Sequence, residues 1–460
     1  MTETKLPSPC TMTTNPLVAL PVASKPLNIL VVGAGVGGPA FATLIQGADH
    51  RHNITVVERS PFLRATGHQI DLKGQGMPIV SKMSLLETVK SYAISEPGME
   101  LVDPNGKRVL HFSAADEFKS EMAKAATSDC EIMRGDLVKV FYEASLKARA
   151  RLTKSFGNEG GLTYEFGKTV TELTQSADAV KVTFSNGQER QYDLVVGADG
   201  QGSCTRRLAF GTEVSVEAFK SLGTFTAFYD IPRAEAETAT AKVYMGPGRR
   251  GIMTRTGDRA VTQVFLFSQA NQEVLRQSLK EPVARQKEVW TTTMTGAGWE
   301  TERFLRGMKD CHDFYACELA QVKMQQWSKG RVVLLGDAGY SPSVMTGMGT
   351  TCSLVGAYVL AGELARHGDD IPAALEEYER VARPAVAGYQ VIPTGMSSNF
   401  FPSSRLGLWF SRNALWAMSA LKIDQLLLRV LPKREDKFDW TIPDYPELNL
   451  KPLNSSPLET

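Results

Sequence analysis

Glycines at positions 33, 35 and 38, in the run Gly33-Ala34-Gly35-Val36-Gly37-Gly38, have the spacing of a loop that binds a dinucleotide. Such glycines permit a tight turn, a close approach of the backbone to a pyrophosphate, and close packing of a helix on a strand. The phosphates then lie at the helix N-terminus, where free N–H groups and the helix dipole stabilise negative charge. The spacing therefore predicts a dinucleotide site, and a tight strand-to-helix turn without a ligand is the alternative interpretation.

The segments on either side of this loop predict the fold that holds it. Residues 27–32 form an apolar run rich in branched side chains, which is typical of a strand buried on both faces of a parallel sheet. We expect a helix from the loop to about Gln46, and a second strand over residues 54–57 that ends at Glu58. An acid at this position accepts hydrogen bonds from an adenosine ribose, and Arg59 follows it on the adenine side. These elements predict a Rossmann-like unit, with FAD and NAD both open as its ligand.

An Asp-Gly turn later in the chain distinguishes these two ligands. Residues 180–184 and 192–196 predict two strands joined through an Asn-Gly turn, and the second strand runs into Asp199-Gly200. Arg206 follows six residues after Gly200, and Asp199 and Arg206 are candidates to bind the cofactor. A nicotinamide dehydrogenase has no use for this Asp-Gly turn, so the motif favours FAD.

A third motif, Gly336-Asp337, ends the apolar strand expected over residues 331–335 and precedes Gly347, Gly349 and a long helical stretch. With the two earlier motifs, it makes the chain resemble the flavoprotein aromatic hydroxylases, a family that includes the tetracycline-inactivating monooxygenases. In that family the aspartate of the Gly-Asp motif binds the flavin ribityl chain, and the glycine turn directs backbone N–H groups at the isoalloxazine. The resemblance implies these roles for Asp337 and for Gly347 and Gly349.

The resemblance covers about residues 27–383 and implies an α/β fold of the para-hydroxybenzoate-hydroxylase type. It consists of a Rossmann-like FAD-binding domain, a substrate domain built on an antiparallel sheet, and a long C-terminal helix. The expected division of the chain is a disordered arm over 1–26, a discontinuous FAD-binding domain over 27–74, 130–211 and 328–392, a substrate domain over 75–129 and 212–327, a bridging helix over 393–432, and a tail over 433–460 that docks loosely or not at all.

Arg134 matches the family pattern, whereas Tyr340 departs from it. Residues 131–137, which contain Arg134, resemble an Arg-x-x-Leu element whose arginine packs near the flavin ribityl chain and pyrophosphate. An exposed arginine at the start of the helix expected over 136–148 is the alternative. Many family members have histidine after the Gly-Asp-Ala-Ala stretch, where this chain has Gly339 and Tyr340. We interpret Tyr340 either as a residue that closes off the flavin or as one that fills core.

Residues 66–76 resemble the family stretch that leaves the FAD-binding domain and passes near the flavin ring. Gln69 and Asp71 are candidates to face the reaction cavity, and His68 is a candidate general base because histidine titrates near neutrality. A lone histidine in a loop also serves as a structural hydrogen-bond donor, and that interpretation stays open.

The middle of the chain predicts the sheet of the substrate domain. We expect strands over residues 225–231, 241–245, 251–255 and 261–267, and helices over 272–290 and 299–308. The family places its substrate between such a sheet and the flavin. Phe225, Phe228, Met253 and Phe267 are candidate wall residues, with ordinary core packing as the alternative for each.

Composition argues against several other classes of function. Lysine plus arginine number 51 against 50 acidic residues, a balance that provides no field to attract nucleic acid or an anionic membrane. The histidines and cysteines lack metal-site spacing, so we predict no metal. Residues 406–431 are apolar but contain four charged residues, so we expect no transmembrane helix, with an amphipathic membrane-contact helix as the alternative. Residues 1–26 do not form a signal sequence, so we expect a cytoplasmic protein.

The resemblance implies an FAD-dependent NAD(P)H monooxygenase that hydroxylates or epoxidises an aromatic or polyketide-like small molecule. In this hypothesis NADPH or NADH reduces FAD, molecular oxygen adds at flavin C4a, and the resulting hydroperoxide transfers one oxygen atom. No second glycine fingerprint follows a strand, so we expect the nicotinamide cofactor to bind transiently. The alternatives are a reductase or dehydrogenase of the same fold and a flavin-free binding protein. The substrate and the oligomeric state are not predicted.

Overall fold

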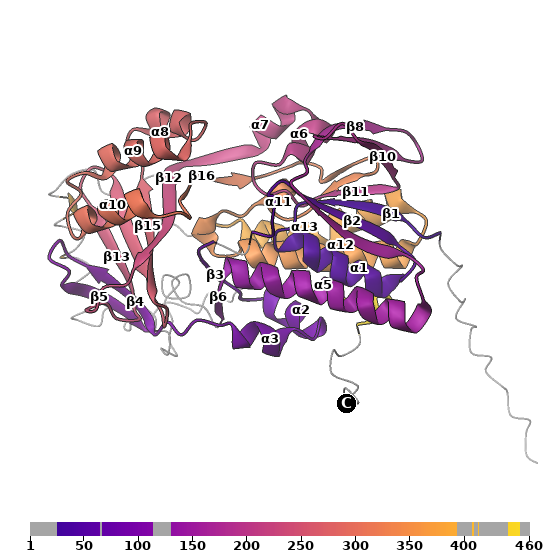
Figure 1. Ribbon diagram of the computed structural model, residues 1–460, viewed down its shortest axis with the longest axis horizontal. Helices are drawn as coiled ribbons and strands as arrows, with labels where there is room; N and C mark the ends of the chain where they lie inside the picture. The colour runs from indigo at the N-terminus through magenta and orange to yellow at the C-terminus, as the bar shows by residue number, and fades with distance from the viewer. Residues whose placement is uncertain are drawn as a thin grey trace, which may run out of the picture.

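The chain folds into two units that lie side by side, each built around its own large sheet (Figure 1). The computed structural model describes residues 25–64, 67–113, 130–392, 407–408, 413 and 440–450. We call the two parts the six-stranded unit and the seven-stranded unit after the main sheet of each. The first sheet has the strand order β17-β18-β11-β1-β2-β7, and the second has the order β16-β12-β15-β14-β13-β4-β5.

The sheet of the six-stranded unit is parallel except at its β17 edge. Val31, in the buried centre of β1, pairs with Val196 of β11 and with Val56 of β2. Because parallel strands end at the same edge, the segments that follow β1, β2, β11 and β18 meet there. The strands are β1 Asn28–Val32, β2 Asn53–Glu58, β7 Gly161–Phe166, β11 Leu194–Gly197, β17 Ser328–Lys329 and β18 Val332–Leu334.

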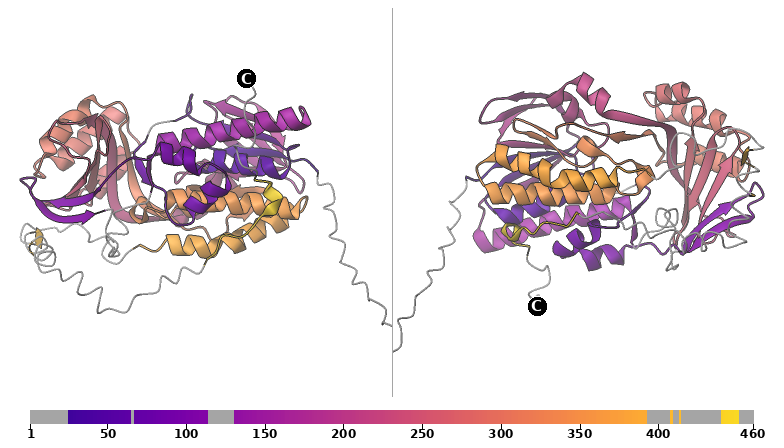
Figure 2. Two further views of the ribbon diagram at one scale, coloured as in Figure 1. Left: turned by 90° about the horizontal axis from the view of Figure 1, so that it is seen from below. Right: turned by 180° about the vertical axis from the view of Figure 1, so that it is seen from behind.

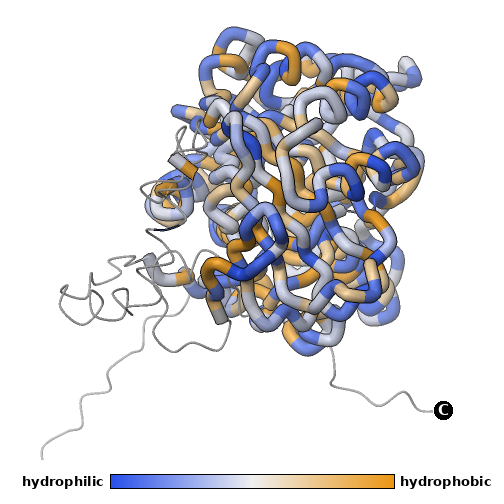
Figure 3. Tube along the Cα trace, turned by 90° about the vertical axis from the view of Figure 1, so that its left-hand side faces the viewer, coloured by the Kyte–Doolittle hydropathy of each residue, from blue (hydrophilic) through white to orange (hydrophobic). Residues whose placement is uncertain are grey.

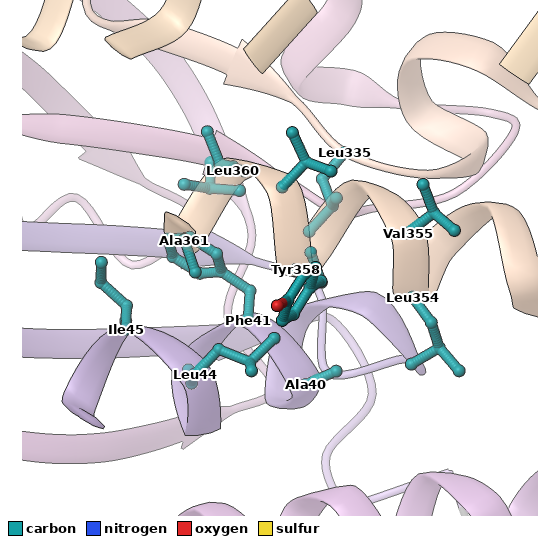
Figure 4. Packing of buried hydrophobic residues seen from close by; sticks show 14 of the residues in the cluster. Ala40, Phe41, Leu44, Ile45, Leu335, Leu354, Val355, Tyr358, Leu360 and Ala361 are labelled. Carbon is teal, nitrogen blue, oxygen red and sulfur yellow. The ribbon is translucent and has the colours of Figure 1, made fainter. Parts of the chain in front are cut away.

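Long helices cover one face of this sheet (Figure 2). They are α1 Gly37–Ala48, α5 Arg134–Phe156, α12 Gly349–His367 and α13 Ile371–Tyr389. Helix α1 packs against α12, and Phe41 of α1 lies beside Tyr358 of α12 (Figure 4). Both rings are almost fully buried, and burying a large apolar side chain contributes about 1.5–3 kcal/mol. This packing holds the glycine loop before α1 against the glycine turn at the start of α12.

A small antiparallel sheet and a short helix cover the opposite face. Val182 and Phe184 of β9 pack in one cluster with Leu30 of β1 and Val195 of β11. The turn between β9 and β10 contains Gly187 at a φ of +78°, as the Asn-Gly signal predicts. The elements are β8 Val170–Gln175, β9 Val180–Phe184, β10 Glu189–Tyr192 and α6 Cys204–Phe210.

The sheet of the seven-stranded unit is antiparallel except where β13 pairs with β4 in parallel. Its strands are β4 Gly98–Val102, β5 Arg108–Ser113, β12 Phe219–Pro232, β13 Ala241–Gly246, β14 Arg250–Arg255, β15 Val261–Ser268 and β16 Tyr315–Val322. Three helices pack on one face, namely α8 Gln272–Ser278, α9 Val283–Met294 and α10 Thr301–Asp310. Figure 3 views the molecule from the side of the seven-stranded unit, where hydrophilic and hydrophobic residues alternate along the chain.

Short elements complete the fold, and two of them join the units. Strands β3 Gln69–Asp71 and β6 Glu131–Met133 form a two-stranded antiparallel sheet beside the seven-stranded unit. The remaining elements are α2 Gly76–Lys82, α3 Leu86–Ser91, α7 Thr212–Ala218, α11 Asp337–Tyr340, and the 3-10 helices η1 Val344–Thr346 and η2 Pro446–Leu448.

The predicted fold class is confirmed, but three parts of the expected division differ from the structure or fall outside it. Helices α2 and α3 pack in the core of the six-stranded unit through Ile79 and Val89, although residues 75–129 were expected in the substrate domain. Residues 440–450 do not dock loosely, since Leu448 is fully buried against that core and Tyr358 donates a hydrogen bond to the Pro443 carbonyl. The expected helix over 393–432 lies almost entirely outside the described residues.

The turn after β1 generates a first prediction. Gly33 has a φ of +112°, and a Cβ atom there would overlap the Ala198 backbone, whereas Gly157 has a φ of +80° with open space around it. We expect Gly157→Ala to lower the free energy of unfolding by about 1 kcal/mol, from backbone strain alone. Gly33→Ala should lower it by about 2–3 kcal/mol, because steric overlap adds to the strain. Denaturant unfolding of both variants measures the difference, and equal losses would contradict the close approach.

Candidate active site

A cavity of about 1270 Å³ lies where the carboxyl edge of the six-stranded sheet faces the seven-stranded sheet. Pockets for one drug-sized ligand measure roughly 300–1,000 Å³, so this cavity can hold a second molecule beside a dinucleotide. All three sequence motifs reach it. The predicted site residues in its wall are Gly33, Gly35, Glu58, Arg59, His68, Gln69, Asp71, Arg134, Asp199, Asp337, Gly347 and Gly349. Gly38, Arg206 and Tyr340 lie outside the wall.

The glycine loop forms one end of the cavity. Gly33 is buried against the backbone of Ala198, so β1 and β11 approach each other directly beneath the loop. Gly35 borders the cavity, while Gly38 lies behind it in α1, where the Gly33 carbonyl leaves no room for a Cβ atom. These two roles match the close approach and the helix packing that the spacing predicts.

Glu58 and Arg59 border the cavity at the end of β2. The Glu58 carboxylate accepts hydrogen bonds from the backbone N–H of Ala34 at 3.1 Å and of Ser60 at 3.0 Å. A carboxylate accepts about four hydrogen bonds, so Glu58 fixes the loop and keeps acceptor capacity toward the cavity. The Arg59 side chain is exposed beside it.

Asp199 lies in the cavity wall, but its carboxylate is already occupied. It accepts hydrogen bonds from Ser203 Oγ at 2.6 Å, from Thr205 N at 2.9 Å and from Thr205 Oγ1 at 3.0 Å. The bond from Thr205 N satisfies a free N–H group in the first turn of α6, as a helix cap does. Asp199 therefore shapes the cavity by holding the start of α6 in place.

Arg206 lies behind the cavity, which differs from the expectation that it contacts the cofactor. Its guanidinium is buried and donates to Ser215 Oγ at 2.9 Å, to the Ala338 carbonyl at 2.6 Å and to the Gln201 carbonyl at 2.8 Å. Burial lowers the pKa of Arg206, and the nearby Asp199 opposes this effect. The Arg206 side chain therefore connects the Asp199-Gly200 motif to the Gly336-Asp337 motif and positions both.

Asp337 and Arg134 are half-buried charged groups, and the hydrogen-bonding capacity of each is not filled among the described residues. Asp337 Oδ1 has no hydrogen-bond partner among the described residues, and burial raises the pKa of this carboxyl against the effects of Ser341 and Arg134. Burial lowers the pKa of Arg134, and among the described residues no carboxylate pairs with its guanidinium within ion-pair distance. Such groups favour a ligand that supplies hydrogen-bond partners, and the hydroxyls and pyrophosphate of FAD are partners of the kind that a carboxylate and a guanidinium bind.

The turn around Gly347 faces the cavity beside Asp71. Gly347 has a φ of +63°, and a Cβ atom there would lie 2.9 Å from Asp71 Oδ2 and 2.8 Å from Lys73 Nζ. Gly349 begins α12 and, with Thr350, directs the N-terminus of this helix at the cavity. A helix N-terminus stabilises negative charge, so this end of the cavity suits a ring that becomes anionic on reduction.

The seven-stranded sheet supplies an apolar, aromatic wall. Phe228 of β12 and Phe265 of β15 lie edge to face, with ring centroids 5.1 Å apart, and Met253 and Phe267 also line the cavity. Phe225 points to the opposite face of β12 and is fully buried in the core beneath the helices, so it is not a wall residue. Further apolar residues in the wall are Met99, Leu101, Leu110, Phe112, Val243 and Ile252.

His68 lies against this wall and does not suit the role of a base. Its ring stacks on Phe228 with centroids 4.4 Å apart and meets Phe265 edge to face. Burial lowers the pKa of His68 to about 3, and the charges of Arg134 and Arg255 add to this shift. The imidazole is therefore neutral at pH 7, and a group whose conjugate acid is so strong accepts protons poorly.

Tyr340 fills core, which is one of the two interpretations that its sequence position allows. The ring is 1% exposed and packs on Trp327, with ring centroids 4.2 Å apart. Its hydroxyl and that of Tyr378 share a hydrogen bond of 2.5 Å, and Tyr378 donates onward to the Leu334 carbonyl. Tyr340 therefore does not close off the cavity.

Gln69 and Asp71 do face the cavity, together with residues that the sequence analysis did not single out. The backbone N–H of Gln69 donates to Gln263 Oε1 at 2.7 Å, which links β3 to β15. Arg255, at the end of β14, lies between the two units and is 7% exposed. The only signal for Arg255 in the sequence is a charged residue at the end of a strand that is buried elsewhere.

The arrangement is that of a flavoprotein in which one cavity serves both cofactor and substrate. Residues 27–390 match the family model described as an FAD binding domain, and the chain belongs to this family of flavoproteins.

Relatives within the family define the activity. The chain is 43% identical over 429 residues to the FAD-dependent monooxygenase asL6 of Sarocladium schorii, covering 92% of this chain and 99% of that protein. It is 31% identical over 414 residues to monooxygenase CTB7 of Cercospora beticola, covering 88% and 95%. The crystal structure of tetracycline destructase Tet(55) is similar with a TM-score of 0.70 and 28% identity, covering 91% of this chain and 98% of that one. The expected class of enzyme, an FAD-dependent monooxygenase, is confirmed.

The described part of the chain lacks two further features. Its helices include none with the length and apolarity needed to cross a membrane. Within the same residues, no group of three or more histidine, cysteine, aspartate or glutamate side chains is placed to hold a metal ion.

The unfilled carboxylate of Asp337 generates a second prediction. We expect Asp337→Ala to weaken FAD binding about ten- to a hundred-fold, because hydrogen bonds to a charged group contribute about 1.5–3 kcal/mol. Asp370→Ala is the control, since Asp370 caps α13 on the surface and its loss lowers stability without touching the cavity. Fluorescence titration of the flavin-free proteins measures both affinities. An unchanged FAD affinity in Asp337→Ala would contradict the assignment.

The guanidinium of Arg134, which has no carboxylate partner among the described residues, generates a third prediction. Arg134→Met should reduce the rise in melting temperature that FAD causes, without lowering the melting temperature of the flavin-free protein, because it removes a half-buried charge that lacks such a partner. Arg149→Met is the control. Arg149 lies on the same helix but donates to the backbone carbonyls of His50 and Glu159. The control should keep the full effect of FAD. Thermal unfolding with and without FAD distinguishes the two variants.

Proposed function

We propose that the enzyme inserts one atom of molecular oxygen into an electron-rich aromatic or polyketide-like small molecule, by hydroxylation or epoxidation. FAD, when bound, supplies the reduction of oxygen and the transfer of the oxygen atom. The observation that carries the proposal is the continuity of the cavity, which runs from the dinucleotide motifs to the aromatic wall of the seven-stranded sheet.

The protein's part in this chemistry is binding, orientation and exclusion of water. Arg134 and Asp337 are placed to hold the pyrophosphate and the ribityl chain, and the N-terminus of α12 is placed to stabilise a reduced ring. Phe228, Met253 and Phe267 present an apolar surface opposite these groups. Such a surface binds an aromatic ring, holds its reacting carbon close and keeps water away.

The apolar wall and the relatives together support this class of substrate. The tetracycline destructases are named after tetracycline, a polycyclic aromatic polyketide. The present chain matches Tet(55) over nearly its full length. Aromatic pairs such as Phe228 and Phe265 favour stacking with flat rings over contact with a small polar molecule. NADPH or NADH is the proposed reductant, and it binds transiently at the same cavity.

Product analysis in an atmosphere of labelled oxygen tests the proposal. The purified protein is incubated with NADPH or NADH and a panel of phenols and polycyclic aromatic polyketides in ¹⁸O₂, and the products are analysed by mass spectrometry. One ¹⁸O atom in the product supports the proposal. Oxidation of the nicotinamide without labelled product would favour a reductase, and a colourless protein that FAD does not reconstitute would favour a flavin-free binding protein.

The apolar wall generates a fourth prediction. Met253→Asp should raise KM for an aromatic substrate about ten- to a hundred-fold, because burying a methionine side chain against a ligand contributes about 1.5–3 kcal/mol. FAD content should stay unchanged, since Met253 lies on the seven-stranded sheet, away from the three motifs. Met253→Leu, which keeps the apolar surface, is the control and should change KM little. A substrate that binds elsewhere would leave KM unchanged in both variants.

A further inference from the structure

Two carboxylates face each other across the small sheet that joins the units. Asp71 of β3 and Glu131 of β6 are direct partners in the antiparallel pair, so their side chains project from the same face. Like charges directly opposite each other destabilise a sheet. A sheet that keeps this pair must either separate the charges with a cation or leave one of the carboxyl groups protonated.

Arg255 reaches this pair from the seven-stranded unit, and a third carboxylate joins it. Its Nη2 atom donates to Glu131 Oε2 and to Glu96 Oε1, the latter at 2.8 Å, while Nη1 lies 3.8 Å from Asp71 Oδ1. Gln69 Nε2 donates to Glu131 Oε2 and lies 3.4 Å from Glu96 Oε2. We call Asp71, Glu96, Glu131, Arg255 and Gln69 the seam cluster.

The charges of the seam cluster do not balance when every group is ionised. Three carboxylates face Arg255 and Lys73, whose Nζ lies 3.4 Å from Asp71 Oδ2. The side chains of Glu96, Glu131 and Arg255 are 2%, 7% and 8% exposed, so water screens the excess negative charge poorly. With Lys73 counted, three negative and two positive charges leave a net charge of −1, which one bound proton neutralises.

Glu131 is the candidate to hold this proton. Burial raises the pKa of Glu131 to about 7. Arg255 and Gln69 oppose the shift, whereas Glu96 and Asp71 add to it. His68 also lies near Arg255 but is neutral, so it does not change this balance at pH 7.

The cluster opens to the cavity on one side only. Asp71, Gln69 and Arg255 line the cavity, whereas Glu96 and Glu131 lie behind them. Asp71 Oδ2 faces the turn at Gly347, where the N-terminus of α12 is directed at the cavity. Asp71 is thus the carboxylate through which a proton held by the cluster reaches bound molecules.

We propose that the seam cluster is the internal proton source for oxygen insertion, with Glu131 as the proton-holding residue and Asp71 as the point of delivery. This rests on the proposed function. Each turnover consumes one O₂, one NAD(P)H and one proton, and releases NAD(P)⁺ and one water, while the second oxygen atom enters the substrate. The Glu131 O–H bond breaks, the proton passes by way of Asp71 to the oxygen atom that leaves as water, and solvent protonates Glu131 again.

Infrared spectroscopy of the FAD-loaded protein tests the proton directly. A protonated carboxyl group absorbs apart from a carboxylate, and we expect such a band to disappear as pH rises through about 7. Burial and Asp313 also raise the pKa of Asp230 to about 7, so the band must be taken as the difference between wild type and Glu131→Gln. Glu237→Gln is the control, because Glu237 is paired with Arg303 and its pKa is lowered.

Thermal unfolding gives a second readout that needs no substrate. The pKa of Glu131 is raised on folding, so the folded state binds the proton more tightly than the unfolded chain does. The stability that this proton provides is present below pH 4.5 and is lost as pH rises through about 7. Glu131→Gln should flatten the fall in melting temperature between pH 5 and 8, and Glu237→Gln should keep it.

The pH profile of turnover then separates proton supply from a structural role. We expect kcat of the wild type to fall as pH rises above about 7, and kcat of Glu131→Gln to be about a hundred-fold lower and independent of pH in that range. FAD content should be the same in both. Absence of the difference band, or a wild-type pH profile in Glu131→Gln, would overturn the proposal and leave the cluster as a structural clamp. If no substrate is oxidised, the infrared and unfolding results still decide the state of Glu131.

Discussion

The parallel pairing of β1 with β2 and β11, and of β11 with β18, is the constraint on which the cofactor site depends. It gathers at one edge the segments that follow strands from both ends of the chain, from Gly33 to Asp337. The packing of α1 on α12 then fixes the first and last of these segments relative to each other. A site assembled in this way tolerates large insertions between its motifs, and the seven-stranded unit consists of two of them, residues 98–113 and 219–322.

The charged groups at this edge fall into two kinds, which indicate different roles. Asp199 and Arg206 have their hydrogen bonds filled by the protein, so they position loops. Asp337 and Arg134 do not, and a half-buried charge without partners costs free energy that a bound ligand can recover. We therefore propose that the unfilled groups contact the cofactor, whereas the filled ones hold the loops that shape the cavity.

The sequence predicted well what depends on local signals. Glycine spacing, the Asn-Gly turn and apolar runs predicted the strands and the dinucleotide site, because each reports on a few adjacent residues, and the resemblance of the three motifs implied the family. The division of residues 75–129 was partly wrong because the apolar faces of α2 and α3 do not specify which core they join. For a related reason the role of Tyr340 was left open and Arg206 was expected at the cofactor, since the side of a loop that faces a cavity depends on packing across the chain. The seam cluster could not be predicted from the sequence, because its members come from β3, β6, β14 and the segment before β4.

The place of the seam cluster follows from a conflict between two requirements of the reaction. Oxygen insertion is best performed in a cavity that excludes water, which the aromatic wall around Phe228 provides. The same reaction consumes a proton, and the apolar residues of this wall carry no group that donates one. Stability alone does not explain three carboxylates around Arg255, since a buried ion cluster often stabilises no more than apolar residues of the same volume. A titratable group just behind the wall satisfies both requirements, because it brings the proton to the cavity without admitting water.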